Sequence, residues 1–312
     1  MINTGDNLAG NSKMKIWEER RTHIERLRKT RSNAPAREDM LSAKARADGI
    51  MLELISEASQ EDLSMFDPVR LAELTMKCVC RDDLRKYYRF RPSRFYGGIS
   101  TADCVGCCLR CVFCWAWNVV SMPMAVGEYC HPEEVVKRLT RVAEKKNLRQ
   151  VRISGNEPTN GWGHLMKVLD LIDGRYLFIL ETNGILIGEH EEYAKDLSRF
   201  RNLHVRVSLK GTCEDEFSRL TGALPEGFVL QLRAMENLVR HGVNCHPACM
   251  TSFSLPENIR ALRSRLKAIH TDFEDFETEE IVLYPYVEER LKKLGFAYYT
   301  AHSPDNIPSE QI

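Results

Sequence analysis

Cysteines are concentrated in one short stretch of the sequence. Five of the eleven lie between positions 104 and 114, in the run DCVGCCLRCVFCWAW. Packing gives no reason to collect thiols in one loop, because cysteine in a protein core behaves as a small apolar side chain. Thiolates held this close together repel one another unless a cation neutralises them, as soft zinc or iron centres do. The run therefore predicts a metal site.

Two ligand spacings fit this run. Cys104 with Cys107 and Cys111 with Cys114 form two Cys-x2-Cys pairs, but the three residues between the pairs are fewer than the spacer of an ordinary zinc ribbon. The alternative is Cys107-x3-Cys111-x2-Cys114, in which three thiolates hold three irons of a four-iron cluster and leave the fourth iron open to a ligand. Cys104, Cys108 and Cys111 repeat that spacing, so two registers remain.

The segment CCLRCVFC resembles the cluster-binding loop of the radical S-adenosylmethionine (SAM) enzymes. In that family Cys-x3-Cys-x2-Cys holds a [4Fe-4S] cluster, and an aromatic residue near the adenine precedes the third cysteine. In the register of Cys107, Cys111 and Cys114, Phe113 precedes the third cysteine. In the register of Cys104, Cys108 and Cys111, Arg110 would precede it. The resemblance therefore implies that these three cysteines bind the cluster and that Phe113 contacts SAM.

The remaining cysteines have no assigned role. Cys104 and Cys108 are extra thiols in the loop, and Cys245 and Cys249 fall on one face of a predicted strand. Burial in the core is the simplest interpretation of the last two.

Short strand-like runs alternate with amphipathic helical runs from residue 95 onward. The expected strands cover 95–100, 150–154, 176–181, 203–209, 243–251 and 280–284, and the clearest helices cover 132–146, 228–241 and 256–269. This alternation predicts an α/β fold of parallel strands wrapped by helices. The stretch is shorter than the ~250 residues of an eight-unit barrel. We expect a partial barrel, and the resemblance implies a (β/α)6 barrel with the cluster loop after its first strand.

Three segments follow from this pattern: a helical accessory segment over 1–94, the barrel over 95–299 and a C-terminal tail over 300–312. The accessory helices are expected at 16–30, 38–58 and 68–80. The basic, aromatic run RDDLRKYYRFRPSR at 81–94 fits either a packed junction or a surface that contacts phosphates and stacks on bases.

Polar and small residues follow three further strands, at the edge of a parallel sheet where ligands gather. Gly155 and Glu157 lie in SGNEP, where the family has a Gly-Gly-Glu-Pro stretch that binds the methionine amino group. Asn183 lies in a Thr-Asn-Gly turn and is a partner for the ribose or the methionine carboxylate. Ser208 and Lys210 share one face of a strand, and the resemblance implies a ribose contact and a carboxylate contact.

Two partial similarities bear on the substrate. Three motifs are similar to those of the enzymes that activate glycyl-radical proteins: the Ser-Leu-Lys strand end, LTG at 220–222 and LYPY at 283–286. Two positions differ, because Ser208 replaces an aspartate and Val287 replaces a histidine. The similarity favours a protein substrate. CVFCW is similar to the cluster loop of the wybutosine-forming tRNA enzyme, which, with the basic run, makes nucleobase modification the alternative.

The resemblance implies an enzyme that cleaves SAM reductively and uses the 5′-deoxyadenosyl radical to abstract hydrogen from a substrate, with ferredoxin or flavodoxin as the electron donor. A non-catalytic iron–sulfur or zinc protein is an interpretation of another class, but it has no need of strand-end groups matched to a zwitterionic nucleoside. Basic and acidic residues balance at 44 each, so global charge gives no argument for a nucleic acid or membrane partner. Without a secretory signal or a membrane span, we expect a cytoplasmic protein. The cluster that the resemblance implies would be oxygen-sensitive, so we expect that cytoplasm to be anaerobic.

Overall fold

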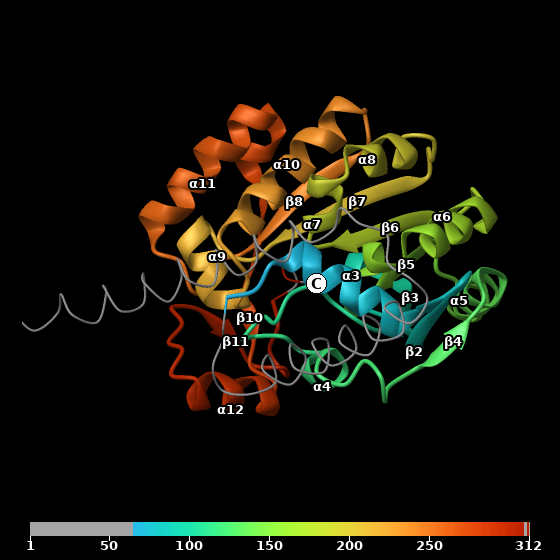
Figure 1. Ribbon diagram of the computed structural model, residues 1–312, viewed down its shortest axis with the longest axis horizontal. Helices are drawn as coiled ribbons and strands as arrows, with labels where there is room; N and C mark the ends of the chain where they lie inside the picture. Colours follow the sequence, from blue (N-terminus) through green and yellow to red (C-terminus); the bar gives the residue numbers. More distant parts are fainter. Residues whose placement is uncertain (1–64, 309–310, 312) are drawn as a thin grey trace, which may run out of the picture. The chain divides into compact units, whose positions relative to one another are not determined.

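Six parallel strands form the centre of the sheet in the computed structural model, which describes residues 65–308 and 311 (Figure 1). Each pairs with the next along the chain, in the order β3 (Ile99–Cys104), β5 (Gln150–Ser154), β6 (Leu177–Thr182), β7 (Leu203–Leu209), β8 (Cys245–Met250) and β9 (Glu277–Glu279). The path does not close on itself. This confirms the expected partial barrel of six parallel strands.

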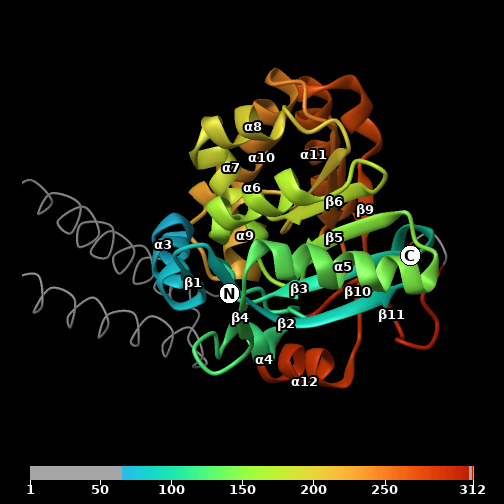
Figure 2. The same cartoon turned by 90° about the vertical axis from the view of Figure 1, so that its right-hand side faces the viewer.

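Helices follow the strands as predicted. They are α5 (Pro132–Lys146), α6 (Trp162–Leu171), α7 (Ile185–Glu189), α8 (Glu191–Leu197), α9 (Glu214–Thr221), α10 (Glu226–Arg240) and α11 (Pro256–Ile269). Proline begins α5, two glutamates occupy its first turn, and Asn147 ends it in the left-handed conformation. Its buried residues include Val135, Leu139 and Ala143, each four positions from the next, and they face the sheet beside β3 and β5 (Figure 2).

Two strand predictions need correction. The first strand begins at Ile99 rather than 95, because Tyr96, Gly97 and Gly98 have positive φ angles and form a turn. The last strand of the large sheet is β9, which lies before the expected strand at 280–284. Within that expected range, β10 (Ile281–Val282) pairs with β11 (Ala301–His302) instead of joining the large sheet. The sequence of β9 is Glu-Thr-Glu, which carries no apolar pattern, and its glutamates pair with buried charges from β7.

The sheet extends upstream of residue 95. Helix α3 (Pro68–Val79) matches the expected helix at 68–80 and leads into β1 (Cys80–Arg81) and β2 (Leu84–Ser93), which pairs antiparallel with β3. Strand β4 (Glu128–Cys130) pairs with β2, and α4 (Trp117–Val120) and α12 (Pro285–Lys293) complete the named elements. The expected helices at 16–30 and 38–58 lie outside the described residues, and the proposed boundary at residue 95 stays a prediction.

The basic run at 81–94 is largely strand β2, and two of its cations point inward. Arg85 is 1% exposed and donates to the backbone oxygens of Val105 and Glu157 at 3.2 and 2.8 Å. Lys86 is also buried and donates to the backbone oxygens of Pro123 and Met124. Neither cation is available for contact with a nucleic acid.

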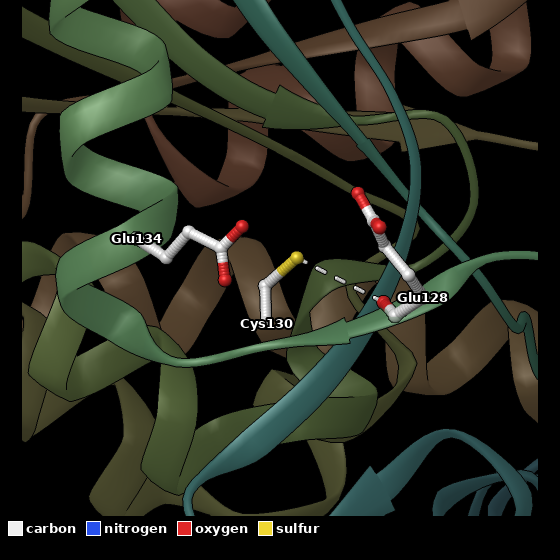
Figure 3. Close-up of side chains that lie close together, drawn as sticks. All are labelled: Glu128, Cys130 and Glu134. Atoms are coloured by element: carbon white, nitrogen blue, oxygen red, sulfur yellow. Dashed lines mark hydrogen bonds between the residues drawn. The ribbon is translucent and has the colours of Figure 1, made fainter.

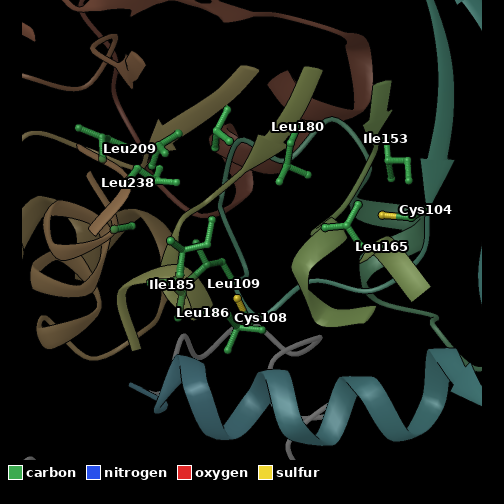
Figure 4. Close-up of a cluster of buried hydrophobic side chains, with 14 of the residues drawn as sticks. Cys104, Cys108, Leu109, Ile153, Leu165, Leu180, Ile185, Leu186, Leu209 and Leu238 are labelled. Carbon is green, nitrogen blue, oxygen red and sulfur yellow. The ribbon is translucent and has the colours of Figure 1, made fainter. Parts of the chain in front are cut away.

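Cys104 and Cys108 belong to the apolar core. Both are fully buried, and Figure 4 shows them among leucines and isoleucines from the strands and the surrounding helices. Cys249 is likewise buried, while Cys245 is half-buried and packs against the same core. No helix within the described range is long and apolar enough to cross a membrane.

His164 on α6 makes stability depend on pH. It is buried with Nδ1 2.7 Å from the backbone oxygen of Asp83, and burial lowers its pKa to about 4. Unfolded histidine takes up a proton near pH 6.5, so the unfolded state gains protons first as pH falls. The folded chain is therefore most stable above pH 6.5 and loses about 2 kcal/mol by pH 5 through this residue.

Urea unfolding at pH 7.5 and pH 5 should show this loss in the parent chain, and His164→Gln should lack it. His131→Gln changes an exposed histidine and is the matched control. The same pH dependence in the His164→Gln chain would contradict the assignment.

Candidate active site

A cavity of about 710 Å³ lies at the carboxyl ends of the parallel strands. Its size is typical of small-molecule sites. All nine residues predicted from the sequence to bind the cluster or SAM line it: Cys107, Cys111, Phe113, Cys114, Gly155, Glu157, Asn183, Ser208 and Lys210. They come from the loop after β3 and from the ends of β5, β6 and β7. Cys104, Cys108, Cys245 and Cys249 are not among the lining residues.

The cysteine loop is fixed by backbone hydrogen bonds to the end of α9. The N–H groups of Arg110 and Val112 donate to the carbonyl oxygens of Thr221 and Leu220 at 3.1 and 2.9 Å. The Leu-Thr-Gly segment at 220–222, singled out in the sequence, therefore supports the loop from outside the cavity. The Arg110 guanidinium is buried and donates to the carbonyl oxygens of Cys107 and Leu109, which places a cation beside the thiols.

The three predicted ligands are spaced more widely than ligands of one ion. Sulfurs bound to a single tetrahedral zinc lie about 3.8 Å apart, given a Zn–S bond of about 2.3 Å. Across residues 65–308, Cys107, Cys111 and Cys114 do not form a group whose donor atoms all lie within 4.8 Å of one another. The three thiols are therefore not gathered around one point in the metal-free structure, and the choice between zinc and a cluster rests on the spacing of the cysteines in the sequence.

The thiols differ in their surroundings. A hydrogen bond from Cys108 lowers the pKa of Cys107, whereas burial raises the pKa of Cys114 to about 11 and that of Cys111 further. The Lys210 ammonium opposes the rise for both of these residues. Ligation requires the thiolate form, so a metal centre would have to displace protons from this loop.

The turn after β5 is joined to the cysteine loop through Gly106. Asn156 Oδ1 accepts a hydrogen bond from the Gly106 N–H at 2.8 Å, and the Glu157 N–H donates to the Gly106 oxygen at 2.9 Å. Gly155 has φ of +97°, and a Cβ there would lie 3.0 Å from the Cα of Asp103. Asn156, which departs from the family's second glycine, thus uses its side chain to hold the loop.

Glu157 is almost fully buried, and its carboxylate is occupied. Oε1 accepts hydrogen bonds from the N–H and hydroxyl of Thr159 and from the hydroxyl of Thr182, at 3.1, 2.7 and 2.7 Å. Oε2 accepts from the Asn183 N–H at 2.7 Å. A carboxylate offers about four lone-pair sites. Glu157 therefore ties the end of β5 to the end of β6.

Gln231 links two strand ends from the side of α10. It is fully buried, and its Nε2 donates to the carbonyl oxygens of Asn183 and Ser208 at 2.6 and 3.1 Å. Its Oε1 accepts from the Lys210 N–H at 3.1 Å. Sequence reasoning missed this residue, since a glutamine inside an amphipathic helix carries no local signal. Asn183 itself donates to Cys108 Sγ at 3.2 Å.

Ser208 and Lys210 belong to a charged network on the cavity wall. Lys210 Nζ donates to Ser208 Oγ, which donates to Glu279 Oε2 at 2.9 Å. Arg206 donates to both Glu277 and Glu279. Although burial opposes it, hydrogen bonds from His246 and Arg206 lower the pKa of Glu277 to about 2.

A second network crosses the neighbouring strands. Arg152 on β5 contacts Glu181 on β6 at 2.5 Å, and the hydroxyls of Tyr96 and Ser154 donate to the same carboxylate at 2.6 Å. Despite burial, the charges of Arg152 and Arg206 lower the pKa of Glu181 to about 2. These residues were not predicted. For Arg152 and Glu181, the signal in the sequence was a charged residue inside an otherwise apolar strand, in QVRIS and LFILET.

One other cluster of potential metal donors occurs in the described part of the chain. Glu128, Cys130 and Glu134 bring their donor atoms within 4.8 Å of one another. Figure 3 shows the three side chains. Arg138 forms ion pairs with both glutamates and lies 3.8 Å from Cys130 Sγ. Because the Arg138 guanidinium is paired with both carboxylates and contacts the thiol, we describe the cluster as an ion-pair network on α5 and β4.

Comparison with known proteins identifies the family. The family model of the Radical SAM superfamily matches residues 103–269. The pyruvate formate-lyase-activating enzyme of Clostridium pasteurianum is 29% identical over 190 residues, which cover 58% of this chain and 72% of that enzyme. The GTP 3′,8-cyclase of Alkaliphilus metalliredigens (strain QYMF) is 29% identical over 139 residues, 42% of this chain and 40% of the cyclase.

Among solved structures, Streptococcus suis SuiB bound to S-adenosylmethionine is similar, with a TM-score of 0.48 and 16% identity over 66% of this chain and 52% of SuiB. The chain thus spans about half of SuiB and less than half of the cyclase. The family model covers more than half of the 312 residues. The chain belongs to the radical SAM superfamily.

Proposed function

We propose that the cavity holds a [4Fe-4S] cluster on Cys107, Cys111 and Cys114, with SAM at the open iron. When bound, these groups supply the chemistry of reductive SAM cleavage, giving methionine and a 5′-deoxyadenosyl radical that abstracts hydrogen from a substrate. The observation that supports this most strongly is the convergence of nine predicted residues from four strand ends on one cavity. A zinc or electron-transfer protein would need no such convergence.

The choice of cysteines is supported by burial. In the alternative register, Cys104 and Cys108 would be ligands, yet both are fully buried and neither lines the cavity. Cys108 has a supporting place instead, since it lies beside Cys107 and lowers the pKa of that thiol. Such outer hydrogen bonds orient and tune metal ligands.

We assign the SAM contacts to the predicted residues that line the cavity. Phe113 stacks on Phe253 with ring centroids 5.5 Å apart and offers an apolar surface to the adenine. Lys210 and Ser208 serve the methionine carboxylate and the ribose. Glu157 lines the cavity, and among the described residues its Oε2 accepts a hydrogen bond only from the Asn183 N–H, so Oε2 and the backbone carbonyls around Gly155 can accept from the methionine ammonium.

A protein is the favoured substrate. The activating enzyme of Clostridium pasteurianum is the relative with the greater coverage, and its name describes action on pyruvate formate-lyase. Modification of a nucleobase is the second candidate, supported by the CVFCW segment. Burial of Arg85 and Lys86 removes two cations on which an RNA contact through the basic run would depend. Ferredoxin or flavodoxin is the proposed electron donor.

Anaerobic reconstitution tests the proposal. The full chain, loaded with iron and sulfide and reduced with dithionite, is expected to convert SAM to 5′-deoxyadenosine and methionine, measured by liquid chromatography. Electron paramagnetic resonance of the reduced protein should change when SAM is added, because SAM binds the open iron. A chain that binds only zinc, or a cluster whose spectrum is indifferent to SAM, would reject the proposal.

A further inference from the structure

Two arginines on β2 share one buried carboxylate at the wall of the cavity. Arg89 Nε donates to Asp103 Oδ2 at 2.6 Å, and Arg91 donates through Nε at 2.8 Å and Nη2 at 3.3 Å. Asp103 is fully buried, whereas both arginines line the cavity. A β-bulge between Tyr87 and Arg89 sets the register in which Arg89 lies opposite Asp103.

This arrangement leaves guanidinium donors unused. Among residues 65–308, neither Nη atom of Arg89 nor the Nη1 atom of Arg91 donates to a carboxylate, and the Tyr88 side chain is the neutral neighbour of Arg89. Two positive charges against the one negative charge of Asp103 leave one positive charge in excess. The other arginines of the cavity are matched, since Arg152 pairs with Glu181 and Arg206 pairs with two glutamates.

Aromatic rings lie beside the unmatched donors. The Trp115 ring is 5.6 Å from Arg89 Cζ, and Trp115 directly follows the predicted ligand Cys114. Tyr284 and Tyr286 line the same cavity with their rings stacked, 5.9 Å apart. The excess charge thus lies on β2, and three strands (β3, β5 and β6) separate β2 from β7, the strand that precedes Lys210, the proposed partner of the SAM carboxylate.

We infer that Arg89 and Arg91 bind a carboxylate of the substrate; this rests on the proposed function, because it takes the cavity as the reaction chamber. A single excess positive charge matches a monoanion, and the free Nη groups offer the forked donors that carboxylates accept. A polynucleotide requires a row of cations for successive phosphates. Arg85 and Lys86, the neighbouring cations of β2, are buried and already bonded.

The test measures binding of small probes to the reconstituted, unreduced enzyme in the presence of SAM. N-acetylglycine supplies a monocarboxylate, N-acetylglycinamide is its neutral counterpart, and dimethyl phosphate represents a phosphodiester. Dissociation constants come from saturation-transfer NMR titrations. Arg89→Lys combined with Arg91→Lys keeps the charge beside Asp103 but removes the forked donors. Arg94→Gln changes an exposed arginine outside the cavity and is the matched control.

N-acetylglycine is expected to bind at least tenfold more tightly than the amide, and the double lysine variant should lose at least tenfold in affinity while Arg94→Gln loses none. Equal binding of acid and amide, or unchanged binding in the double variant, would overturn the inference. Tighter binding of dimethyl phosphate than of the acid would assign a phosphodiester instead.

If the double lysine variant does not fold, Arg89→Gln, Arg91→Gln and Asp103→Asn together remove all three charges and should give the same loss. The probes bind without SAM cleavage. A failure of N-acetylglycine to bind is therefore distinguishable from a failure of the enzyme to form 5′-deoxyadenosine.

Discussion

Cys114→Ala is expected to abolish SAM cleavage, while Cys104→Ala retains it. Loss of a residue that merely orients a ligand costs about 10–100-fold in metal affinity or activity, so loss of a ligand should exceed about 100-fold. Cys104 is fully buried and outside the cavity, so its replacement should cost stability of about 1 kcal/mol and leave the rate near that of the parent chain. Iron and sulfide content and the rate of 5′-deoxyadenosine formation measure both effects.

The Cys108→Ala variant tests whether Cys108 supports Cys107 or is itself a ligand of the cluster. Its hydrogen bond lowers the pKa of Cys107, so its loss is expected to reduce the rate about tenfold and to leave most of the iron in place. Full activity in Cys114→Ala, with loss in the Cys104 and Cys108 variants, would establish the other register. Equal loss in all of them would point to general collapse of the loop, which circular dichroism would detect.

Much of the scaffold could be predicted because its signals are local. The strands at 150–154 and 203–209 and the helices at 132–146 and 256–269 have the predicted bounds, since apolar periodicity, prolines and turn residues mark them. The nine site residues could be selected because they lie in motifs at or after the ends of predicted strands that resemble those of the family. Cysteine spacing supplied the remaining signal.

The parts that could not be predicted depend on partners distant in sequence. Gln231 contacts residues at positions 183, 208 and 210, and Arg85 bridges two loops, yet neither stands out among its neighbours. Strand β9 was misplaced because its glutamates are held by Arg206 rather than by apolar contacts. The role of Glu157 toward SAM was inferred from resemblance and stays a prediction, whereas its bonds with Thr159, Thr182 and Asn183 had no local signal in the sequence.

Glu157→Ala is expected to be strongly destabilising. It leaves four donors without an acceptor in a buried position, and breaking a buried ionic or hydrogen-bonded network in this way costs about 3–5 kcal/mol. Glu157→Gln keeps the shape and one oxygen acceptor, but its amide faces the Asn183 N–H. Its cost is therefore expected at about 1–3 kcal/mol. Urea unfolding of the metal-free chain measures both, with Glu236→Gln as the exposed control.

The same variants decide what Glu157 does for SAM. If Glu157 only positions the turns, the affinity for SAM should fall in proportion to the loss of stability, and Glu157→Gln should retain most of both. If instead Glu157→Ala unfolds like the parent chain but no longer binds SAM, the carboxylate contacts the methionine ammonium directly, as the family resemblance implies. In that case the ammonium would take the remaining lone pair of Oε2, which within the described residues accepts a hydrogen bond only from the Asn183 N–H.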